Sequence, residues 1–362
     1  MKVGILGGGQ LARMIALAGH PLGVACTFID PAREACAAAV AEQVASPYEE
    51  LAQLDSLTAE CDVVTFEFEH IPAAALRYLE SYDNVFPRPS AILVAQDRLR
   101  EKTLFRDLGI PVPPFASIGS REEFDAAIAT IGMPLVIKTR TLGYDGKGQK
   151  VIRCAADIEA AWAELGGQPL LAEGFVPFER EVSMIAARDR TGAVACYALS
   201  ENVHRDGILR VARPYTNAAL QQQAEDYSRR VLDELEYVGV LAFEFFVHDG
   251  GLLANEIAPR VHNSGHWTIE GAGTSQFENH LRAILGLTLG STETVGHSAM
   301  VNFIGRMPTA AEVFAIPNTH LHHYGKADRP GRKVGHVTVR AATRDQLEAS
   351  LQSVIALSDK MG

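Results

Sequence analysis

The chain has 362 residues, of which 47% are hydrophobic and 21% charged, and its formal net charge is -11. This composition is typical of a globular protein with two or three domains, and without a long basic run it argues against a large surface for nucleic acid or anionic membranes. We therefore expect no nucleic-acid partner. No apolar run reaches the about 18 residues of a membrane span and no cleavable signal precedes the first strand, so we expect no membrane association and a cytoplasmic location. The five cysteines form no CxxC pair, which favours reduced thiols over disulfides or a zinc site.

The first hundred residues alternate short apolar runs with helical patterns. Strands are predicted at 3–6, 24–29 and 63–66, and helices at about 11–18 and 73–79. This β-α-β-α-β order predicts a parallel sheet with crossover helices.

A glycine-rich turn follows the first strand. Residues 3–12 satisfy the dinucleotide fingerprint, and Asp30 ends the next strand where a ribose-binding acid is expected. The glycines of such a turn let the backbone approach a phosphate at the N-terminus of the following helix. Three interpretations stay open here: NAD(P), another phosphorylated ligand, or a purely structural turn.

The pattern changes in the middle of the chain. Prolines at 87–89 and 111–114 bracket one helical segment at 90–108, predicted to connect two domains, and its Lys102 is expected on a solvated face. Further strands are predicted at 135–138, 149–153, 170–172, 182–187 and 193–199, with one helix among them, as in a small antiparallel α+β domain. Helices are predicted at 219–235 and 276–285, and short strands with a final helix make up the rest.

A second glycine-rich loop, 143–148, connects two of these strands. Its glycines leave backbone N–H groups available for phosphate oxygens, while Lys138 on the preceding strand can place its ammonium on an α/β-phosphate. The loop lacks the strand-to-helix order of a Walker motif, which favours a hairpin lid. Downstream, 173–176 is predicted to form an apolar slot with free backbone groups for an adenine ring, and Glu181 is well placed for ribose hydroxyls.

Two later apolar runs flank the turn Asp249-Gly250-Gly251, and each carries one glutamate, Glu244 or Glu256, where a core residue is expected. If the turn is a three-residue hairpin loop, the two glutamates lie directly opposite each other on one sheet face. Because facing carboxylates repel, a divalent metal with nucleotide phosphates would turn this arrangement into a binding site. Two alternatives stay open: solvent-facing glutamates, or a loop of another length that places Asn255 or Ile257 opposite Glu244.

The order of these features matters more than any one of them. A lysine-ended strand, a glycine lid, the 173–176 linker, Glu181 and a carboxylate hairpin follow one another as in the ATP-grasp superfamily, which the chain resembles over nearly its whole length. The resemblance implies two α+β halves that hold ATP, with Mg²⁺ on carboxylates of the second half. The implied fold class is α/β plus α+β: a Rossmann-like N-terminal domain at 1–97, an ATP-grasp domain at 98–290 with a lid at about 117–178, and a small C-terminal β-rich subdomain at 291–362 that packs on the ATP-grasp core.

Finer motifs narrow the resemblance to one family. Residues 255–267 read NEIAPRVHNSGHW, with Ala258 where many ATP-grasp enzymes carry a metal-binding Asn, and the segments 7–11, 65–70 and 329–336 also resemble the N5-carboxyaminoimidazole ribonucleotide synthetase family. The resemblance implies carboxylation of 5-aminoimidazole ribonucleotide (AIR) with bicarbonate and ATP, through carboxyphosphate, to N5-carboxyaminoimidazole ribonucleotide, ADP and phosphate in de novo purine biosynthesis. ATP and Mg²⁺ are the implied cofactors, and a homodimer is the implied assembly.

The resemblance also implies the site residues. Those around ATP are Arg98, Lys138, Gly143, Tyr144, Asp145, Gly146, Lys147, Gly148, Gln149, Glu173, Gly174, Phe175, Val176, Glu181, His204, Asn255 and Glu256, and the metal ligands are Glu244 and Glu256. Those on the AIR or bicarbonate side are Gln10, Glu67, Glu69, His70, His266, Lys326 and Arg332. The catalytic candidates are Tyr144, Asp145, Arg260, Lys326 and Arg332, with Asp145 as a candidate acceptor of the amine proton.

Three rival functions have to be separated from this one. An NAD(P)-dependent oxidoreductase rests on the first 30 residues only and leaves the facing glutamates without a purpose. A non-catalytic ATP-binding module predicts binding without turnover. A sister ATP-grasp ligase acting on glycinamide ribonucleotide or formate is disfavoured by residues 262–266 and 329–333.

Overall fold

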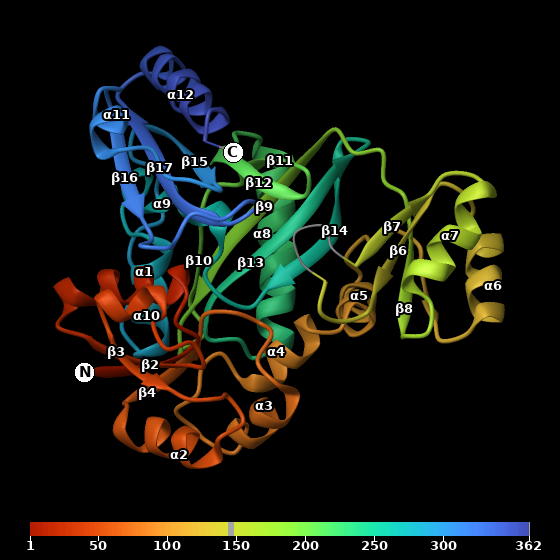
Figure 1. Cartoon of the computed structure of the whole chain (residues 1–362), viewed down its shortest axis with the longest axis horizontal. Helices are drawn as coiled ribbons and strands as arrows, with labels where there is room; N and C mark the ends of the chain where they lie inside the picture. The colour runs from red at the N-terminus through yellow and green to blue at the C-terminus, as the bar shows by residue number, and fades with distance from the viewer. Residues whose placement is uncertain (144–147, 362) are drawn as a thin grey trace.

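Residues 1–143 and 148–361, the part of the chain that the computed structural model describes, form three β-sheets with helices packed around them. The N-terminal domain and the C-terminal strands lie on the same side of the molecule, and a small lid domain projects from the opposite side (Figure 1). A large sheet runs between them. No helix in this described part is long and apolar enough to cross a membrane.

The N-terminal sheet is parallel, with strand order β3-β2-β1-β4, which confirms the predicted β-α-β-α-β pattern. Its strands are β1 (Lys2–Leu6), β2 (Ala25–Asp30), β3 (Glu42–Ala45) and β4 (Val63–Phe66), and its helical elements are α1 (Gln10–Gly19), η1 (His20–Leu22), η2 (Cys36–Ala39), α2 (Leu51–Glu60) and α3 (Ala73–Leu79). Every residue of β4 is buried, although β4 is the last strand in this order, and its outer side is covered in part by a parallel bridge between Val64 and Val85.

The connector is two helices rather than the single predicted one, α4 (Pro89–Ala95) and α5 (Arg98–Asp107). Asp97 separates them with an extended backbone, φ -121° and ψ 105°, and its side chain accepts a hydrogen bond from the N–H of Leu99. A side-chain oxygen in this position satisfies one of the unpaired N–H groups of a helix N-terminus. The aspartate therefore starts a new helix where the apolar pattern alone indicated continuation.

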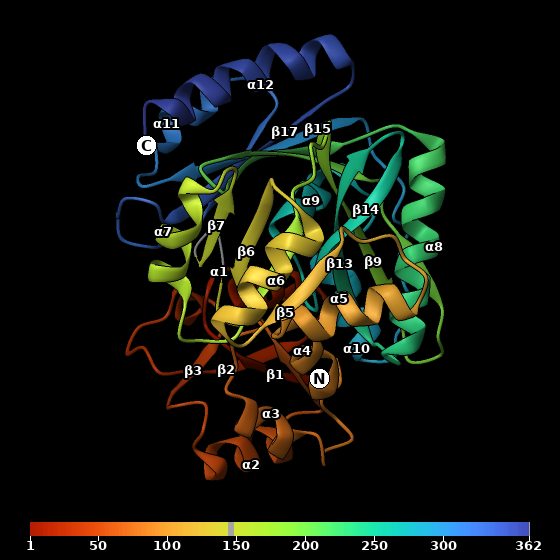
Figure 2. The same cartoon turned by 90° about the vertical axis from the view of Figure 1, so that its right-hand side faces the viewer.

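The lid domain is an antiparallel sheet with strand order β5-β8-β6-β7. Its strands are β5 (Phe115–Ile118), β6 (Leu135–Thr139), β7 (Gln149–Ile152) and β8 (Leu170–Gly174), and its helices are α6 (Arg121–Ile131) and α7 (Ala156–Leu165). Both views place α6 and α7 on the sheet face turned away from the large sheet (Figure 1, Figure 2). The sequence prediction missed β5 and α6, which precede the segment where strands were expected.

The large sheet has the strand order β14-β13-β9-β11-β12-β15-β17-β16, and β10 pairs with the C-terminal end of β9, beyond the residues that pair with β11. Its strands are β9 (Arg180–Arg188), β10 (Val194–Cys196), β11 (Ser200–Arg205), β12 (Ile208–Pro214), β13 (Gly239–His248), β14 (Gly251–Ala258), β15 (His297–Ile304), β16 (Thr319–His323) and β17 (Lys333–Ala341). The helical elements around it are α8 (Ala218–Glu234), η3 (Asn263–Gly265), α9 (Thr268–Gly271), α10 (Gln276–Ile284), α11 (Ala310–Phe314) and α12 (Arg344–Asp359). The predicted strand at 193–199 is wrong in extent, because the chain forms short β10 and then a separate β11–β12 hairpin.

The C-terminal strands continue the large sheet, since β15 pairs with β12 through Val211 and Val301. The sheet therefore runs without a break from the carboxylate hairpin at one edge to β16 at the other. The N-terminal domain packs on it through α1, which contacts α10. This packing brings the loops of the N-terminal domain close to the face of the hairpin.

Candidate active site

Glu244 and Glu256 of the carboxylate hairpin pair as predicted, but the turn and the register between the strands differ from the prediction. The turn has two residues, Asp249 and Gly250, both with positive φ (49° and 72°), so the predicted three-residue loop is wrong. A two-residue loop on regular strands would place Asn255 opposite Glu244. Instead the register shifts after the Phe245–Ala254 pair, which leaves Asn255 as an extra residue and pairs Glu244 with Glu256. A β-bulge therefore produces the predicted facing of the two glutamates.

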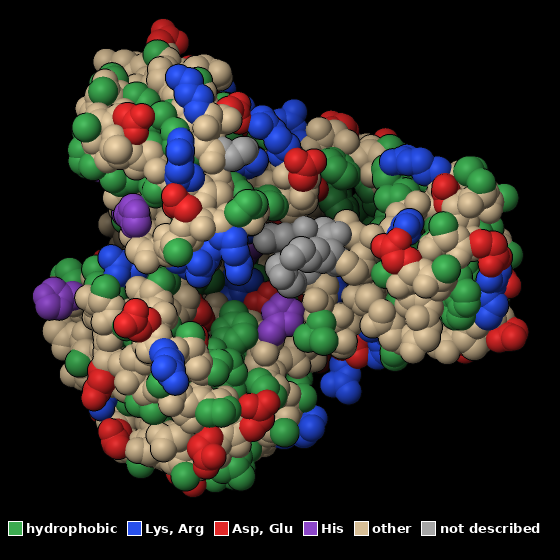
Figure 3. Space-filling view, viewed as in Figure 1, with side chains coloured by type: hydrophobic (Ala, Val, Ile, Leu, Met, Phe, Trp, Pro, Cys, Tyr) green, Lys and Arg blue, Asp and Glu red, His purple; other side chains and the backbone are tan. Residues whose placement is uncertain are grey.

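A cavity of about 590 Å³ lies where the N-terminal domain, the lid and the large sheet meet. Lys and Arg side chains gather in the hollow at the centre of this face (Figure 3). The predicted residues that line the cavity are Gln10, Glu67, Glu69, His70, Arg98, Lys138, Gly143, Gln149, Glu181, His204, Glu244, Asn255, Glu256 and Arg260. Residues from all three parts of the molecule thus converge on one cavity.

Other predicted residues lie elsewhere. Tyr144, Asp145, Gly146 and Lys147 fall outside the described residues. Gly148, Glu173, Gly174, Phe175, Val176, His266, Lys326 and Arg332 are described but are not among the residues that line the cavity. Glu101, His262 and Lys333 do line it, although the sequence analysis did not select them.

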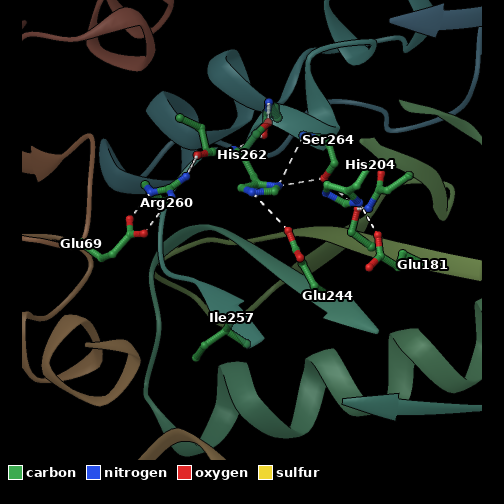
Figure 4. Close-up of polar contacts among 12 residues, drawn as sticks. Glu69, Glu181, His204, Glu244, Ile257, Arg260, His262 and Ser264 are labelled. Atoms are coloured by element: carbon green, nitrogen blue, oxygen red, sulfur yellow. Dashed lines mark hydrogen bonds and ion pairs between the residues drawn. The ribbon is translucent and has the colours of Figure 1, made fainter. Parts of the chain in front are cut away.

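The facing glutamates, which are partly exposed, form an acidic cluster with the buried Glu101 of α5. Burial, and then the charge of Glu256, raise the pKa of Glu244 to about 8. The same two causes raise the pKa of Glu101 to about 8. His262 lies beside this cluster, with Nε2 3.3 Å from Glu244 Oε1 (Figure 4). These carboxylates would be stabilised by a cation, although no group of three or more His, Cys, Asp or Glu side chains in the described ranges is arranged to hold a metal by itself.

Lys138 of β6 is held by Glu173 of β8, with Nζ 2.8 Å from Oε2. Lys102 of α5 approaches the other oxygen of Glu173 at 3.6 Å. Burial alone would raise the pKa of Glu173, but the two lysines outweigh it and hold that pKa at about 2. The carboxylate is 2% exposed. It therefore orients the two lysines instead of facing the cavity.

The predicted solvated position of Lys102 is wrong, since the residue is 1% exposed. Its Nζ donates to the carbonyl oxygen of Ala254 at 3.1 Å. The helical pattern of α5 contains charged residues on several faces, so it did not indicate that α5 packs against β14. Contact with a distant strand buries the lysine.

The predicted adenine slot also differs from expectation. Strand β8 extends to Gly174, whose N–H donates to Pro114, and the N–H of Phe175 donates to Pro134. The sequence analysis expected free backbone groups here, but these two donors have partners inside the lid domain. The extra length of β8 arises because it lies between β5 and β6 and pairs with both.

Glu181 and His204 lie on paired strands, β9 and β11, and form an ion pair (Figure 4). Burial works to lower the pKa of His204, but the neighbouring carboxylate of Glu181 raises it above its usual value. An imidazole and a carboxylate thus lie side by side on the cavity wall. Both residues are those that the family resemblance implied near ATP.

Glu69 and Arg260 join the N-terminal domain to the end of β14. Two N–H groups of the guanidinium donate to the carboxylate at 2.5 Å and 3.0 Å, so the pair is bidentate (Figure 4). Burial opposes ionisation of Glu69, but Arg260 outweighs it and lowers the pKa of the carboxyl to about 2. The guanidinium group of Arg260 therefore already binds the Glu69 carboxylate in this structure.

The N-terminal glycine turn is occupied by the protein's own carboxylates. Glu67 accepts hydrogen bonds from the N–H groups of Gly9 at 2.5 Å and Ala12 at 3.0 Å, and Asp30 accepts from Gly8 at 2.9 Å. The N-terminus of α1 is where a dinucleotide would place its pyrophosphate. Because Glu67 fills this position, the geometry disfavours the NAD(P) interpretation and assigns Glu67 a structural bond in addition to its place on the cavity wall.

The C-terminal candidates divide into two groups. Lys326 donates a hydrogen bond to the side chain of Gln10. Because Gln10 lines the cavity, Lys326 lies at the cavity edge. His266 is 1% exposed and packs against His336, with ring centroids 4.9 Å apart. The structure therefore does not bring His266 to the cavity. It follows η3, which turns the chain into the protein interior.

Family models match the chain in three consecutive segments. An ATP-grasp domain model covers residues 103–277, a ribonucleotide synthetase preATP-grasp domain model covers 1–96, and a phosphoribosylaminoimidazole carboxylase C-terminal domain model covers 298–350. In chain order, these segments correspond to the N-terminal domain, to the lid together with strands β9–β14 of the large sheet, and to the last strands of that sheet, β15–β17. The fold and the cavity thus define an ATP-grasp enzyme with an ATP-binding domain.

Relatives narrow the class further. An N5-carboxyaminoimidazole ribonucleotide synthase from Pseudomonas aeruginosa is 57% identical over 357 residues, which is 99% of each chain, and one from Escherichia coli is 40% identical over 358 residues, 98% of this chain and 95% of the relative. A solved synthetase from Thermus thermophilus superimposes with a TM-score of 0.94 at 51% identity over 98% of both chains. The chain belongs to the N5-carboxyaminoimidazole ribonucleotide synthase family of purine biosynthesis, which confirms the resemblance inferred from its motifs.

One solved relative bears directly on ligands. The Aspergillus clavatus synthase in complex with ADP and 5-aminoimidazole ribonucleotide has a TM-score of 0.91 and 33% identity, with 99% of this chain and 98% of that chain covered. That relative therefore holds a nucleotide and the aminoimidazole substrate together within the same fold.

Proposed function

We propose that the protein carboxylates AIR with bicarbonate and ATP, through carboxyphosphate, to yield N5-carboxyaminoimidazole ribonucleotide, ADP and phosphate. The observation that carries this proposal is one cavity that contains Glu244, Glu256 and Lys138 together with the Glu69–Arg260 pair from two domains. A ligase that uses ATP to join bicarbonate to AIR needs such a common cavity for its substrates. The Aspergillus clavatus complex with ADP and AIR supports the same assignment.

Glu244 and Glu256 are our proposed Mg²⁺ ligands. Their fit to the ion is supported by the facing of two carboxylates: burial and then the charge of Glu256 raise the pKa of Glu244, and a divalent cation would remove the second of these effects. Mg²⁺ bound there would neutralise charge on the nucleotide phosphates. Asn255, the bulged residue between the strands, is proposed to lie at the same end of the nucleotide.

The reaction has two steps. A bicarbonate oxygen attacks the γ-phosphorus, the bond to the bridging oxygen breaks, and ADP leaves. The AIR amine nitrogen then attacks the carbon of carboxyphosphate, or of CO₂ released from it. By either route the C–O bond to phosphate breaks, phosphate leaves and one amine proton is lost. Lys138 and Arg98 are proposed to stabilise the charge that develops on the phosphoryl oxygens.

The lid is proposed to protect the intermediate. Carboxyphosphate hydrolyses in water, so exclusion of water has a chemical purpose. Residues 117–178 are our proposed lid, with Gly143, Gly146 and Gly148 in its glycine loop. Asp145, in that loop, is our proposed acceptor of the amine proton. Tyr144 is proposed to contact the reacting groups.

The AIR side is proposed at the junction of the N-terminal domain and the C-terminal strands. Gln10, Glu69 and His70 would face the aminoimidazole, and Lys326 and Arg332 would bind its phosphate or the new carboxylate. The bond between Lys326 and Gln10 supports this grouping, because it joins two candidates that are far apart in the sequence.

The deciding experiment measures ADP release from Mg-ATP and bicarbonate with and without AIR. AIR is expected to stimulate ADP release, and N5-carboxyaminoimidazole ribonucleotide should appear in equal amount. Glycinamide ribonucleotide and formate serve as matched controls for a sister ligase, and titration with NADH tests the oxidoreductase alternative. Absence of AIR-dependent stimulation would refute the assignment.

We also propose a cytoplasmic homodimer, as the family resemblance implies. Light scattering coupled to size-exclusion chromatography should give about twice the monomer mass of 39.1 kDa. A monomer at micromolar concentration would contradict this part of the proposal.

A further inference from the structure

Helix α5 sends two consecutive ionisable side chains, Glu101 and Lys102, into the protein interior, where they are 2% and 1% exposed. Both reach backbone groups of β14. Lys102 Nζ donates to the carbonyl oxygen of Ala254 at 3.1 Å, and the N–H of Ile257 donates to Glu101 Oε1 at 2.7 Å. The two contacts lie on either side of Asn255, the bulged residue.

Strand β14 is the edge of the large sheet, so one side of its backbone has no neighbouring strand. In a regular edge strand, the groups on this side belong to every second residue. Leu252 and Ala254 follow this rule, since their N–H groups donate at 2.9 Å and 2.8 Å to acceptors on α8 and in the segment after α5. The next outward N–H belongs to Ile257, three residues further on rather than two, because the bulge adds a residue.

The contacts from α5 match this irregular spacing. A regular strand would direct the N–H of residue 256 outward, and Glu101 would then meet a different residue. We propose that Glu101 and Lys102 are positioning residues that hold the bulge at Asn255 and thereby set the pairing of Glu256 with Glu244. This inference rests on the proposed role of those two glutamates in binding Mg-ATP.

Lys102 also connects the two sides of the proposed nucleotide site, the lid and the carboxylate hairpin. Lys102 contacts Glu173 at 3.6 Å, and Glu173 in turn bonds Lys138 at 2.8 Å. The same lysine therefore contacts the strand that carries Glu256 and the carboxylate that orients Lys138. A change at Lys102 should disturb both.

A general stabilising role does not account for these contacts. A well-packed apolar pair often stabilises a core as well as a buried charged pair does. Holding a strand backbone at two points, however, requires one donor and one acceptor at a defined separation. Glu101 and Lys102 supply these in neighbouring positions, which a Leu or Met pair would not.

The test compares Glu101→Gln with Glu101→Met. Glutamine keeps an oxygen that accepts the Ile257 N–H, whereas methionine has similar length and no such acceptor. Hydrogen–deuterium exchange of the Ile257 amide, measured on the full chain at single-residue resolution, should accelerate about tenfold or more in Glu101→Met and stay within about threefold of wild type in Glu101→Gln. This measurement requires no turnover.

Steady-state kinetics provide the second readout. In Glu101→Met, KM for Mg-ATP should rise about tenfold while KM for AIR stays within about twofold, since the AIR candidates lie on other elements. Lys102→Met should show the same split, and it replaces Glu101→Met if that variant fails to fold. Equal changes in both KM values, unchanged Ile257 exchange in the methionine variants, or a glutamine variant as impaired as the methionine variant would each overturn the inference. If the wild type shows no AIR-dependent ADP release, the proposed function fails while the exchange result still decides whether the pair holds the bulge.

Discussion

Replacement of Glu173 by glutamine tests the buried charge network beside the proposed nucleotide site. Glu173 lies between Lys138 and Lys102, at 2.8 Å and 3.6 Å, and is 2% exposed. Glutamine preserves the shape of the side chain and removes its negative charge. Lys102, 1% exposed, would then lose its ion pair while it remains buried.

The magnitude follows from the pKa of the carboxyl. The lysines hold it at about 2 instead of 4.5, against the effect of burial. At about 1.4 kcal/mol for each pH unit, this corresponds to about 3 kcal/mol of stability. Breaking a buried pair by removing one partner costs about 3–5 kcal/mol by an independent measure. We therefore expect Glu173→Gln to lower the free energy of unfolding by about 3 kcal/mol at pH 7.

The sign of the pH dependence is defined by the lowered pKa. A carboxyl whose pKa is lower in the folded state stabilises the protein above its unfolded pKa, and this contribution disappears as the pH falls toward the folded pKa. The difference between wild type and Glu173→Gln should be constant from about pH 5 to 8 and shrink between about pH 4.5 and 2. Urea unfolding at several pH values measures it.

A matched control comes from the same domain. Glu164 forms an ion pair with Lys150 on the lid surface, and its side chain is 58% exposed. Glu164→Gln should cost less than about 1 kcal/mol, because water and salt screen exposed pairs. Equal losses in the two variants, or a Glu173→Gln loss that does not change with pH, would refute the reasoning.

Three further predictions concern the turn, the domain junction and the metal. In urea unfolding, Gly7→Ala should lower the free energy of unfolding by about 3 kcal/mol, because φ is +105° and a Cβ would lie 2.3 Å from the Glu67 Cγ. The control Gly23→Ala, where φ is +68° and no atom lies within 4 Å of the added Cβ, should lower it by about 1 kcal/mol. Arg260→Lys should reduce kcat/KM for AIR about 10- to 100-fold, since lysine cannot reproduce the bidentate bond to Glu69. Glu244→Gln should raise the Mg²⁺ concentration for half-maximal ADP release about tenfold, and removal of Mg²⁺ with EDTA should stop the reaction.

Each of these predictions has an outcome that contradicts it. Equal losses for the two glycine variants would mean that the close approach at Gly7 carries no cost. Near-normal turnover of Arg260→Lys would show that the guanidinium fork has no role in the reaction. An unchanged Mg²⁺ requirement in Glu244→Gln would remove that residue from the metal site.

The sequence predicted the architecture well because the spacing of hydrophobic residues along a short segment indicates whether that segment is a helix or a strand. Buried strands such as β4 and the helix α3 were predicted with the observed bounds, and the N-terminal glycine turn lies between β1 and α1 as predicted. The motif at 255–267 was sufficient to indicate the family, since a long run of specific residues carries information that periodicity lacks. Missed elements, such as β5 and α6, have short or weakly apolar patterns that the sequence analysis did not separate from loops.

The functions of individual charged residues required the tertiary structure. The N-terminal turn matched a dinucleotide fingerprint, yet Glu67, 58 residues after Gly9, fills the position of the phosphate. Nothing local to the turn indicates which carboxylate the fold will bring there. The same applies to Lys102, whose burial results from contact with a distant strand, at a sequence separation of 152 from Ala254.

The facing of Glu244 and Glu256 shows both contributions. By itself, the sequence determined that two apolar strands with one glutamate each would form a hairpin, because alternation and the Asp-Gly turn are local signals. Only the tertiary structure decided the pairing, since the turn is one residue shorter than predicted and the bulge at Asn255 compensates for it. A bulge at a sheet edge is stabilised by the side chains that pack against it, here from α5, and these contacts between distant segments leave no local pattern in the sequence.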